Sequence, residues 1–145
     1  RRDIAGTSGI EYLSTVCKND ADIKNLCTAF RLKRRKALPE NAENFFYDGG
    51  AISVPDLMLF VKEPEKAKKA LSATEYGTLA LELADKKASP SECEKALEEK
   101  YYAGLMKVKD DIFGSGKVVA YAILYEKWLC DLRLLLTAKK VGKTI

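Results

Sequence analysis

Apolar residues recur at intervals of three and four along most of the chain, which is the spacing of one face of an α-helix. The stripe Ile23, Leu26, Cys27 and Phe30 places such a face on a helix that we expect to begin at Asp20, as its cap, and to end near residue 36. A shorter helix is expected before it, over residues 8–18. The polar residues Asp22, Lys24, Arg31 and Arg34 are expected mostly to face outward.

Helix-breaking residues divide the middle of the chain into short segments. Pro39 and Asp48-Gly49-Gly50 bracket one or two turns, and short helices are predicted over residues 53–62, 64–71 and 74–87. Ser89-Pro90-Ser91-Glu92 is a capping box with proline at the first helical position, so a longer helix should run from there to about residue 112. The residues it should bury are Leu97, Tyr101, Leu105 and Val108.

After a break at Phe113-Gly114-Ser115-Gly116, the last helix is expected over residues 117–140, with Gly142 ending it. Its apolar residues have helical spacing, and we expect this set to face inward: Val118, Tyr121, Ala122, Tyr125, Trp128, Leu129, Leu132 and Leu136. Few stretches alternate with period two, so no strand is required. The predicted fold class is all-α, a helical bundle.

Residues 23–34 and 129–140 resemble each other at a constant offset of 106 positions, so that Leu26 corresponds to Leu132 and Phe30 to Leu136. The two segments also share a basic end, with Lys33-Arg34 corresponding to Lys139-Lys140. Repeated amphipathic segments are typical of a small helical unit used more than once. We therefore expect residues 1–50 to end one repeat unit and residues 51–145 to form a second, unless the two are one continuous domain.

Composition narrows the possible chemistry. The 145 residues are 47% hydrophobic and 32% charged, as in an ordinary globular domain, and the net charge is +4. Because the chain has no histidine, it cannot form a Ser-His-Asp triad, a Cys-His pair or a His-ligated metal site. The four cysteines, Cys17, Cys27, Cys93 and Cys130, are scattered and form no C-x-x-C pair. They are interpreted as buried, reduced thiols of a cytoplasmic protein, with a disulfide as the alternative. We expect no catalytic residue, metal site or cofactor, and no run is apolar enough to predict a membrane-spanning helix.

Several local motifs have a simple structural interpretation. Gly114-Ser115-Gly116-Lys117 lacks the frame of a phosphate-binding loop and is interpreted as a helix connector. The pairs Asp110-Asp111 and Glu98-Glu99 point about 100° apart on a helix, so neither makes a shared site. Phe45-Phe46-Tyr47 either fills a gap between helices or forms a docking patch.

The basic run at residues 31–36 has two interpretations. Cations at the end of a helix complement its negative dipole end, or they contact an acidic protein or a membrane surface. Nucleic acid is the weakest alternative, because no aromatic residues are interleaved with the charges.

Particular residues also resemble a known family. Phe113-Gly114, Val118-Val119-Ala120-Tyr121, Tyr125-Glu126, Leu132-Arg133 and Lys139-Lys140 resemble the C-terminal signature of the central-stalk C/d subunit of A/V-type rotary ATPases. The segment from Asp20 to Leu26 resembles an earlier copy of the signature and carries its asparagine, Asn25, where the later copy has Asp131. Family members carry about three such units, and the chain has two and begins without methionine. It is therefore interpreted as the C-terminal two-thirds of a member.

The resemblance implies a non-catalytic role. Members of that family form a helical funnel on the cytoplasmic face of the membrane rotor ring and receive the foot of the central shaft, so they couple ATP chemistry to ion transport. It implies peripheral rather than inserted membrane association, with shaft subunits and the rotor ring as partners and no nucleic acid. The positions singled out as a candidate partner interface are Asn25, Arg31, Lys33, Arg34, Arg133, Lys139 and Lys140. The alternative is an unrelated helical adaptor in which the repeat is coincidental amphipathicity.

Overall fold

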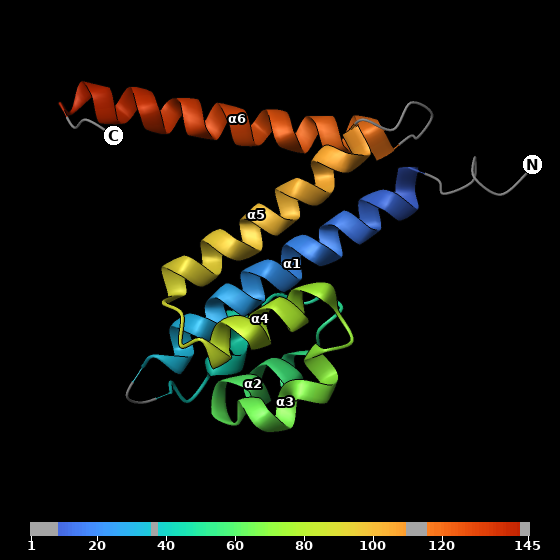
Figure 1. Ribbon diagram of the computed structural model, residues 1–145, viewed down its shortest axis with the longest axis vertical. Helices are drawn as coiled ribbons and strands as arrows, with labels where there is room; N and C mark the ends of the chain where they lie inside the picture. Colours follow the sequence, from blue (N-terminus) through green and yellow to red (C-terminus); the bar gives the residue numbers. More distant parts are fainter. Residues whose placement is uncertain (1–8, 36–37, 110–115, 143–145) are drawn as a thin grey trace, which may run out of the picture. The chain divides into compact units, whose positions relative to one another are not determined.

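The computed structural model describes residues 9–35, 38–109 and 116–142, and all of its regular elements are helices (Figure 1). In chain order these are α1 (Gly9–Lys33), the short 3₁₀ helix η1 (Ala42–Phe45), α2 (Val54–Lys62), α3 (Pro64–Leu71), α4 (Glu75–Asp85), α5 (Pro90–Lys109) and α6 (Gly116–Lys140). No strand occurs among the described residues, which confirms the all-α prediction.

Helix α1 is a single element, whereas two helices were predicted with Asp20 as the cap of the second. Neither glycine nor proline occurs inside α1 to break it. The Asp20 carboxylate accepts a hydrogen bond from Lys24 Nζ at 2.7 Å, four residues later on the same helix. Asp20 therefore stabilises the interior of α1 through an (i, i+4) pair rather than starting a helix.

Three of the other predicted helix starts are confirmed by their caps. The Ser53 hydroxyl accepts a hydrogen bond from the Asp56 amide at the start of α2, and Thr74 caps α4 by accepting one from the Gly77 amide. At α5 the capping box is complete, because the Ser89 amide donates to Glu92 Oε2 at 2.7 Å and the Glu92 amide donates to Ser89 Oγ at 3.2 Å. The predicted end of α5 near residue 112 and the first three residues of the predicted break at 113–116 lie outside the described residues, and the fourth, Gly116, begins α6.

The chain forms two compact units, one of residues 14–101 and one of residues 1–13 with 102–145. These units do not divide at residue 50, where the boundary between the two repeat units was expected. The assignment of residues 1–50 and 51–145 to repeats stays a prediction from the sequence.

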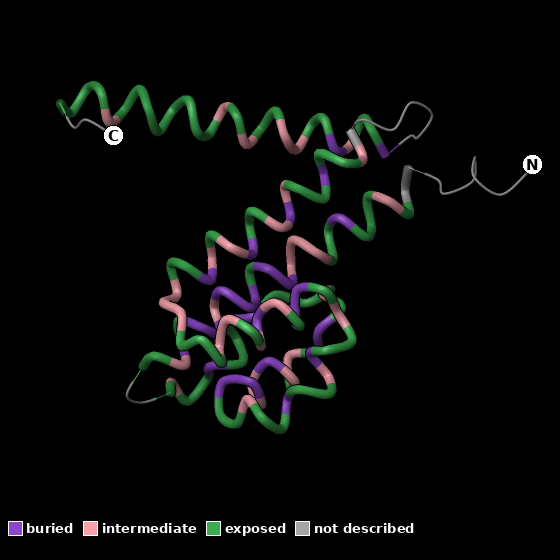
Figure 2. Tube along the Cα trace, in the orientation of Figure 1, coloured by how far each residue is buried: buried purple, intermediate pink, exposed green. Residues whose placement is uncertain are grey.

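The unit of residues 14–101 contains most of the buried apolar side chains (Figure 2). The α1 stripe of Ile23, Leu26, Cys27 and Phe30 is buried as predicted. The ring of Phe30 packs edge-on against Phe60 of α2, with centroids 5.4 Å apart. Leu57, Leu71 and Leu97 bring α2, α3 and α5 into the same core with no exposed surface.

Asp22 is a correction to the predicted outward face of α1. Its side chain is only 1% exposed, and its carboxylate accepts hydrogen bonds from the amides of Ala51 and Ile52 at 3.2 and 3.0 Å. Gly50 has to lack a side chain here, because a Cβ would overlap the Asp22 carboxylate. The buried carboxylate thus holds the loop that leads into α2.

The other unit contains α6 and the adjoining ends of α1 and α5. Gly116, the first residue of α6, lies against the ring of Tyr12, and a Cβ on it would come within 2.9 Å of that ring. Lys127 lies over the Tyr102 ring, 5.6 Å from its centroid. Gly142 follows α6 with φ of +71°, the left-handed conformation that commonly ends a helix, as predicted.

Candidate partner-binding surfaces

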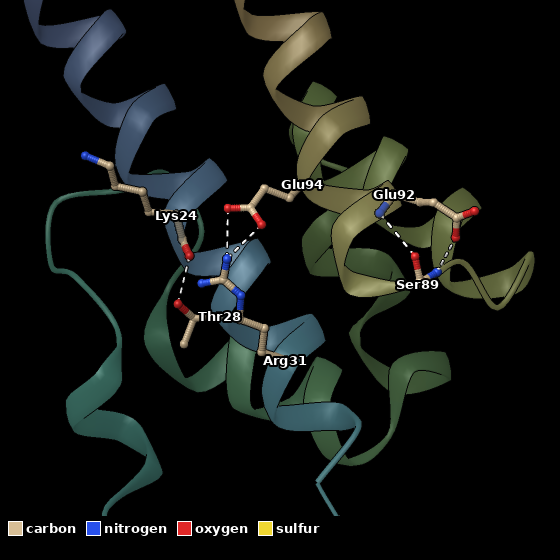
Figure 3. Close-up of polar contacts among 6 residues, drawn as sticks. All are labelled: Lys24, Thr28, Arg31, Ser89, Glu92 and Glu94. Atoms are coloured by element: carbon tan, nitrogen blue, oxygen red, sulfur yellow. Dashed lines mark hydrogen bonds and ion pairs between the residues drawn. The ribbon is translucent and has the colours of Figure 1, made fainter. Parts of the chain in front are cut away.

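Three of the seven candidate interface residues lie at the C-terminal end of α1. Arg31 makes a two-pronged contact with α5, its guanidinium donating to both carboxylate oxygens of Glu94 at 2.7 and 2.8 Å (Figure 3). The hydrogen bond and the charge of Glu94 raise the pKa of Arg31. Both side chains are substantially exposed, so the pair contributes on the order of 0–1 kcal/mol to folding.

Lys33 and Arg34 continue the same basic end. Lys33 is half-buried, with its ammonium group 5.1 Å from the centre of the Phe60 ring. Arg34 is exposed, and its positive charge contributes to lowering the pKa of Glu92, although the hydrogen bonds from Ser89 are the larger cause. Arg31 and Lys33 therefore already serve contacts within the unit, and Arg34 keeps the most accessible charge.

Asn25 is a second correction, because a partner-facing residue should be accessible. Its side chain is 0% exposed. The amide Nδ2 donates to the Tyr47 carbonyl at 2.9 Å, and the Tyr47 amide donates to Asn25 Oδ1 at 2.7 Å. Asparagine can satisfy both groups of one peptide in this way, so Asn25 holds a loop in place and is left out of the interface proposed below.

The remaining candidates, Arg133, Lys139 and Lys140, are exposed in the second half of α6. Lys139 and Lys140 occupy its last turn, where positive charge complements the helix dipole. The helix that carries these basic residues differs from its prediction, because most of the apolar residues of α6 are exposed rather than buried (Figure 2).

The predicted inward face of α6 is wrong for most of its members. The exposed fractions are 73% for Val118, 59% for Tyr121, 53% for Tyr125, 56% for Trp128, 37% for Leu132 and 60% for Leu136. Ala122 is also exposed, and Leu129 is half-buried. The spacing correctly showed that these residues belong to a helix, but it could not show whether anything covers them.

Five of the exposed residues form a continuous row that we call the α6 seam: Val118, Tyr121, Tyr125, Trp128 and Leu132. Their spacing alternates between three and four residues, which is the pattern by which one helix packs along another. Beside the seam, Met106 and Leu124 join its three aromatic residues around a hollow of about 340 Å³. An exposed apolar row of this size is typical of a protein-binding surface.

The two segments that resemble each other in sequence, residues 23–34 of α1 and 129–140 of α6, differ in how far they are buried. Leu26 is 0% exposed and its counterpart Leu132 is 37% exposed, while Phe30 and Leu136 differ between 5% and 60%. The two segments therefore have unlike surroundings in this structure, although their sequences resemble each other.

Three further features of the described residues concern metal-binding groups, cysteines and membrane-spanning segments. These residues contain no group of three or more histidine, cysteine or acidic side chains able to hold a metal ion. All four cysteines are free, with Cys27 and Cys93 buried and Cys17 and Cys130 exposed, so the predicted burial is wrong for the last two. None of the helices among the described residues includes a stretch long and apolar enough to cross a membrane.

An all-α chain with an exposed apolar seam and basic helix ends is a helical protein of the interaction class. The family model described as ATP synthase (C/AC39) subunit matches residues 2–143, nearly the whole sequence, so the chain belongs to that family. Because the chain belongs to this family, the alternative interpretation of the sequence as an unrelated helical adaptor is set aside. No curated protein and no solved structure matches the chain.

Proposed function

We propose that the chain is a non-catalytic central-stalk component of an A/V-type rotary ATPase, which couples the central shaft to the membrane rotor ring during ion transport. The family match over residues 2–143 is the observation that supports this proposal most directly. The proposed location is peripheral, at the cytoplasmic face of the membrane. The subunit would transmit torque through surface contacts and would take no part in ATP hydrolysis.

The surface that best fits such contacts is α6. Its seam offers apolar area to a partner helix, and Arg133, Lys139 and Lys140 add positive charge beyond the end of the seam. Apolar contact supplies most of the binding energy in such an interface, whereas peripheral charges steer association. We therefore propose that the seam binds a helical partner subunit and that the three basic residues face an acidic surface of the complex. Arg34 is proposed as a further contact.

Complementation in cells that lack the subunit tests both the function and the surface. Membranes from cells supplied with the wild-type gene should pump ions on addition of ATP, and the subunit should co-purify with the rotor ring. The double variant Tyr125→Ala/Trp128→Ala should reduce both measurements severalfold, and Arg133→Ala/Lys139→Ala/Lys140→Ala should reduce co-purification most at low salt, where the charges are least screened. Because all five side chains are exposed, the variants should keep the wild-type melting temperature.

The matched control is Lys95→Ala/Glu99→Ala, which removes an exposed ion pair from α5 and should pump as the wild type does. Normal pumping by both α6 variants would refute the assignment of the surface. Normal pumping by cells without the subunit would refute the proposed function itself. ATP hydrolysis by the purified chain would contradict the non-catalytic role.

A further inference from the structure

The α6 seam lies on one continuous helix, so the relative positions of its side chains follow from helix geometry (Figure 1). Its first and last residues, Val118 and Leu132, are 14 positions apart, which at 1.5 Å per residue is about 21 Å. Every member is between 37% and 73% exposed. The ring centroids of Tyr125 and Trp128 are 5.8 Å apart, with the ring planes tilted by 31°. The seam therefore presents a preformed apolar surface to another helix.

The charges beside the seam have both signs and occur in a definite order. Lys117 precedes the seam and is exposed, and Asp131 lies 14 residues later on the same flank of the helix. The Asp131 carboxylate accepts from Lys127 of its own helix at 2.6 Å, yet its side chain is 51% exposed and has a second oxygen. Because this flank begins positive and ends negative, a strongly acidic or strongly basic partner would face a like charge at one end.

A second copy of the same helix avoids that conflict if it runs in the opposite direction. The copy is turned end for end about the level of Leu124, which is midway between Lys117 and Asp131. Lys117 of each chain then lies opposite Asp131 of the other, as in any symmetric pair where each contact occurs twice. Leu124 lies opposite its own counterpart between the two charged contacts. The flank is thus complementary to itself in both charge and apolar character.

The apolar residues of the seam fit the same arrangement. At this register Val118 lies near Trp128 of the second copy, and Tyr121 lies near its Tyr125. Each of the three aromatic side chains therefore meets an apolar or aromatic residue of the other chain. Unlike side chains that alternate across a helix pair fill its core better than identical ones placed face to face.

A parallel copy fits less well. It places Lys117 beside Ala122 of the second chain and Asp131 beside its Leu136, so neither charge meets one of opposite sign. It also sets identical large side chains, such as the two Trp128 rings, against each other. The order of residues along α6 therefore favours the antiparallel direction.

The area available to such a pair is that of a weak complex. Tyr121, Tyr125 and Trp128 are each more than half exposed. An aromatic side chain buries about 150–250 Å² when it is covered, so the seams of two copies would together cover on the order of 1,000 Å². This lies at the lower end of the range for specific interfaces. The pair should therefore dissociate in the micromolar range, and a partner with a larger surface can displace the second copy.

We propose that the chain, outside the ATPase, pairs with a second copy of itself through the α6 seam, with the two helices running antiparallel. The second copy removes the seam from water until a partner subunit takes its place. The pairing itself depends only on the seam, whereas its displacement by a partner subunit rests on the function proposed above.

Sedimentation equilibrium of the intact chain tests the pairing and its direction. The wild type should pass from monomer to dimer in the micromolar range, and Tyr125→Ala/Trp128→Ala should weaken association by at least about 10-fold. At low salt Lys117→Asp and Asp131→Lys should each weaken it by about 5-fold, because each creates like-charge contacts at both ends of the pair. The combined variant Lys117→Asp/Asp131→Lys should return to within about 2-fold of the wild type, since both ion pairs are restored with their signs exchanged.

Lys95→Asp is the matched control, because it makes the same change at an exposed position of α5 and should associate as the wild type does. The proposal is overturned if the wild type stays monomeric up to millimolar concentration, or if the combined variant is no tighter than the single ones. Equal loss of association in Lys95→Asp and Lys117→Asp would overturn it as well. None of these outcomes affects the proposed function, because ion pumping measures that separately. A dimer that stays intact when the rotor ring binds would overturn the displacement of the second copy.

Discussion

At the scale of single residues, the polar side chains that matter most are the buried ones on α1. Asn25 and Asp22 lie on the same helix as the apolar stripe, three residues apart, and both turn toward the loop of residues 47–52. A buried amide or carboxylate costs free energy unless its hydrogen bonds are satisfied, and no buried side-chain polar atom among the described residues lacks a partner. These two side chains therefore define the path of the loop.

The substitution Asn25→Asp tests this role with almost no change in shape. Aspartate cannot donate to the Tyr47 carbonyl and brings a charge into a fully buried position, so the free energy of unfolding should fall by about 2–4 kcal/mol. Asn44→Asp makes the same chemical change at an exposed site of the adjacent 3₁₀ helix and should stay within about 0.5 kcal/mol of the wild type. Denaturant titration of both variants gives the comparison, and equal stabilities would contradict a structural role for Asn25.

The buried thiol of Cys27 leads to a prediction about how the free energy of unfolding depends on pH. Burial is the main cause that raises the pKa of its thiol from 9.0 to about 11, and the negative charge of Glu94 adds to the effect. Because the folded-state pKa lies above the unfolded one, the thiol's contribution to stability is complete below about pH 9 and is lost as the pH rises toward 11. Cys27→Ala should make the alkaline decline of the unfolding free energy shallower. Cys130→Ala, at an exposed position, should leave the decline unchanged, and an identical slope in all three proteins would refute the assignment.

At the scale of elements, helix ends were predictable because their signals are local. The caps at Ser53, Thr74 and Ser89 depend only on a hydroxyl and the amides two or three residues later, which any reader of the sequence can find. The continuity of α1 was missed because Asp20 has the chemistry of a cap and also that of an (i, i+4) partner for Lys24. Only the surrounding structure selects between these two uses.

The accessibility of the candidate interface residues was likewise predictable only where it did not depend on contacts with residues far away in the sequence. Arg133, Lys139 and Lys140 are accessible as expected, since lysine and arginine are seldom buried. The burial of Asn25 depends on Tyr47, 22 residues away, and no local pattern reports such a contact. The exposed seam of α6 was missed for a related reason. Its spacing is identical to that of a buried face, and whether it is covered depends on other segments or other chains.

Lys87, just after the end of α4, has a strained backbone conformation, and a substitution can relieve this strain. Lys87 has φ of +54°, the left-handed region that glycine adopts freely, and its amide bonds to the Ala84 carbonyl at 3.0 Å as the helix closes. Lys87→Gly should raise the free energy of unfolding by about 1 kcal/mol. Lys86→Gly, one residue earlier in ordinary helical conformation, should lower it by about 0.5–1 kcal/mol. Thermal or denaturant unfolding measures both, and a loss of stability in the Lys87 variant would contradict the strain.

At the scale of the whole molecule, the two units differ in how their helices are stabilised. The helices of residues 14–101 share a core of fully buried leucine and phenylalanine side chains. In contrast, α6 buries Gly116 and Ala120 near its start and exposes Leu134, Leu135 and Leu136 farther along. Backbone hydrogen bonds alone stabilise a helix only marginally in water. The last turns of α6 should therefore open more readily than the helices of the buried core.

Native-state hydrogen exchange measures this difference directly. Amides of α1 from Leu26 to Leu32 open only with the core and should exchange at least ~100-fold more slowly than those of α6 from Leu132 to Lys139. Addition of the shaft subunits or the rotor ring should slow exchange in α6 and leave the α1 amides as they are. Tyr125→Ala/Trp128→Ala should weaken that protection, because it removes the middle of the seam. Equal protection of both segments in the free chain would mean that α6 is stable without a partner, and its exposed residues would then need another explanation.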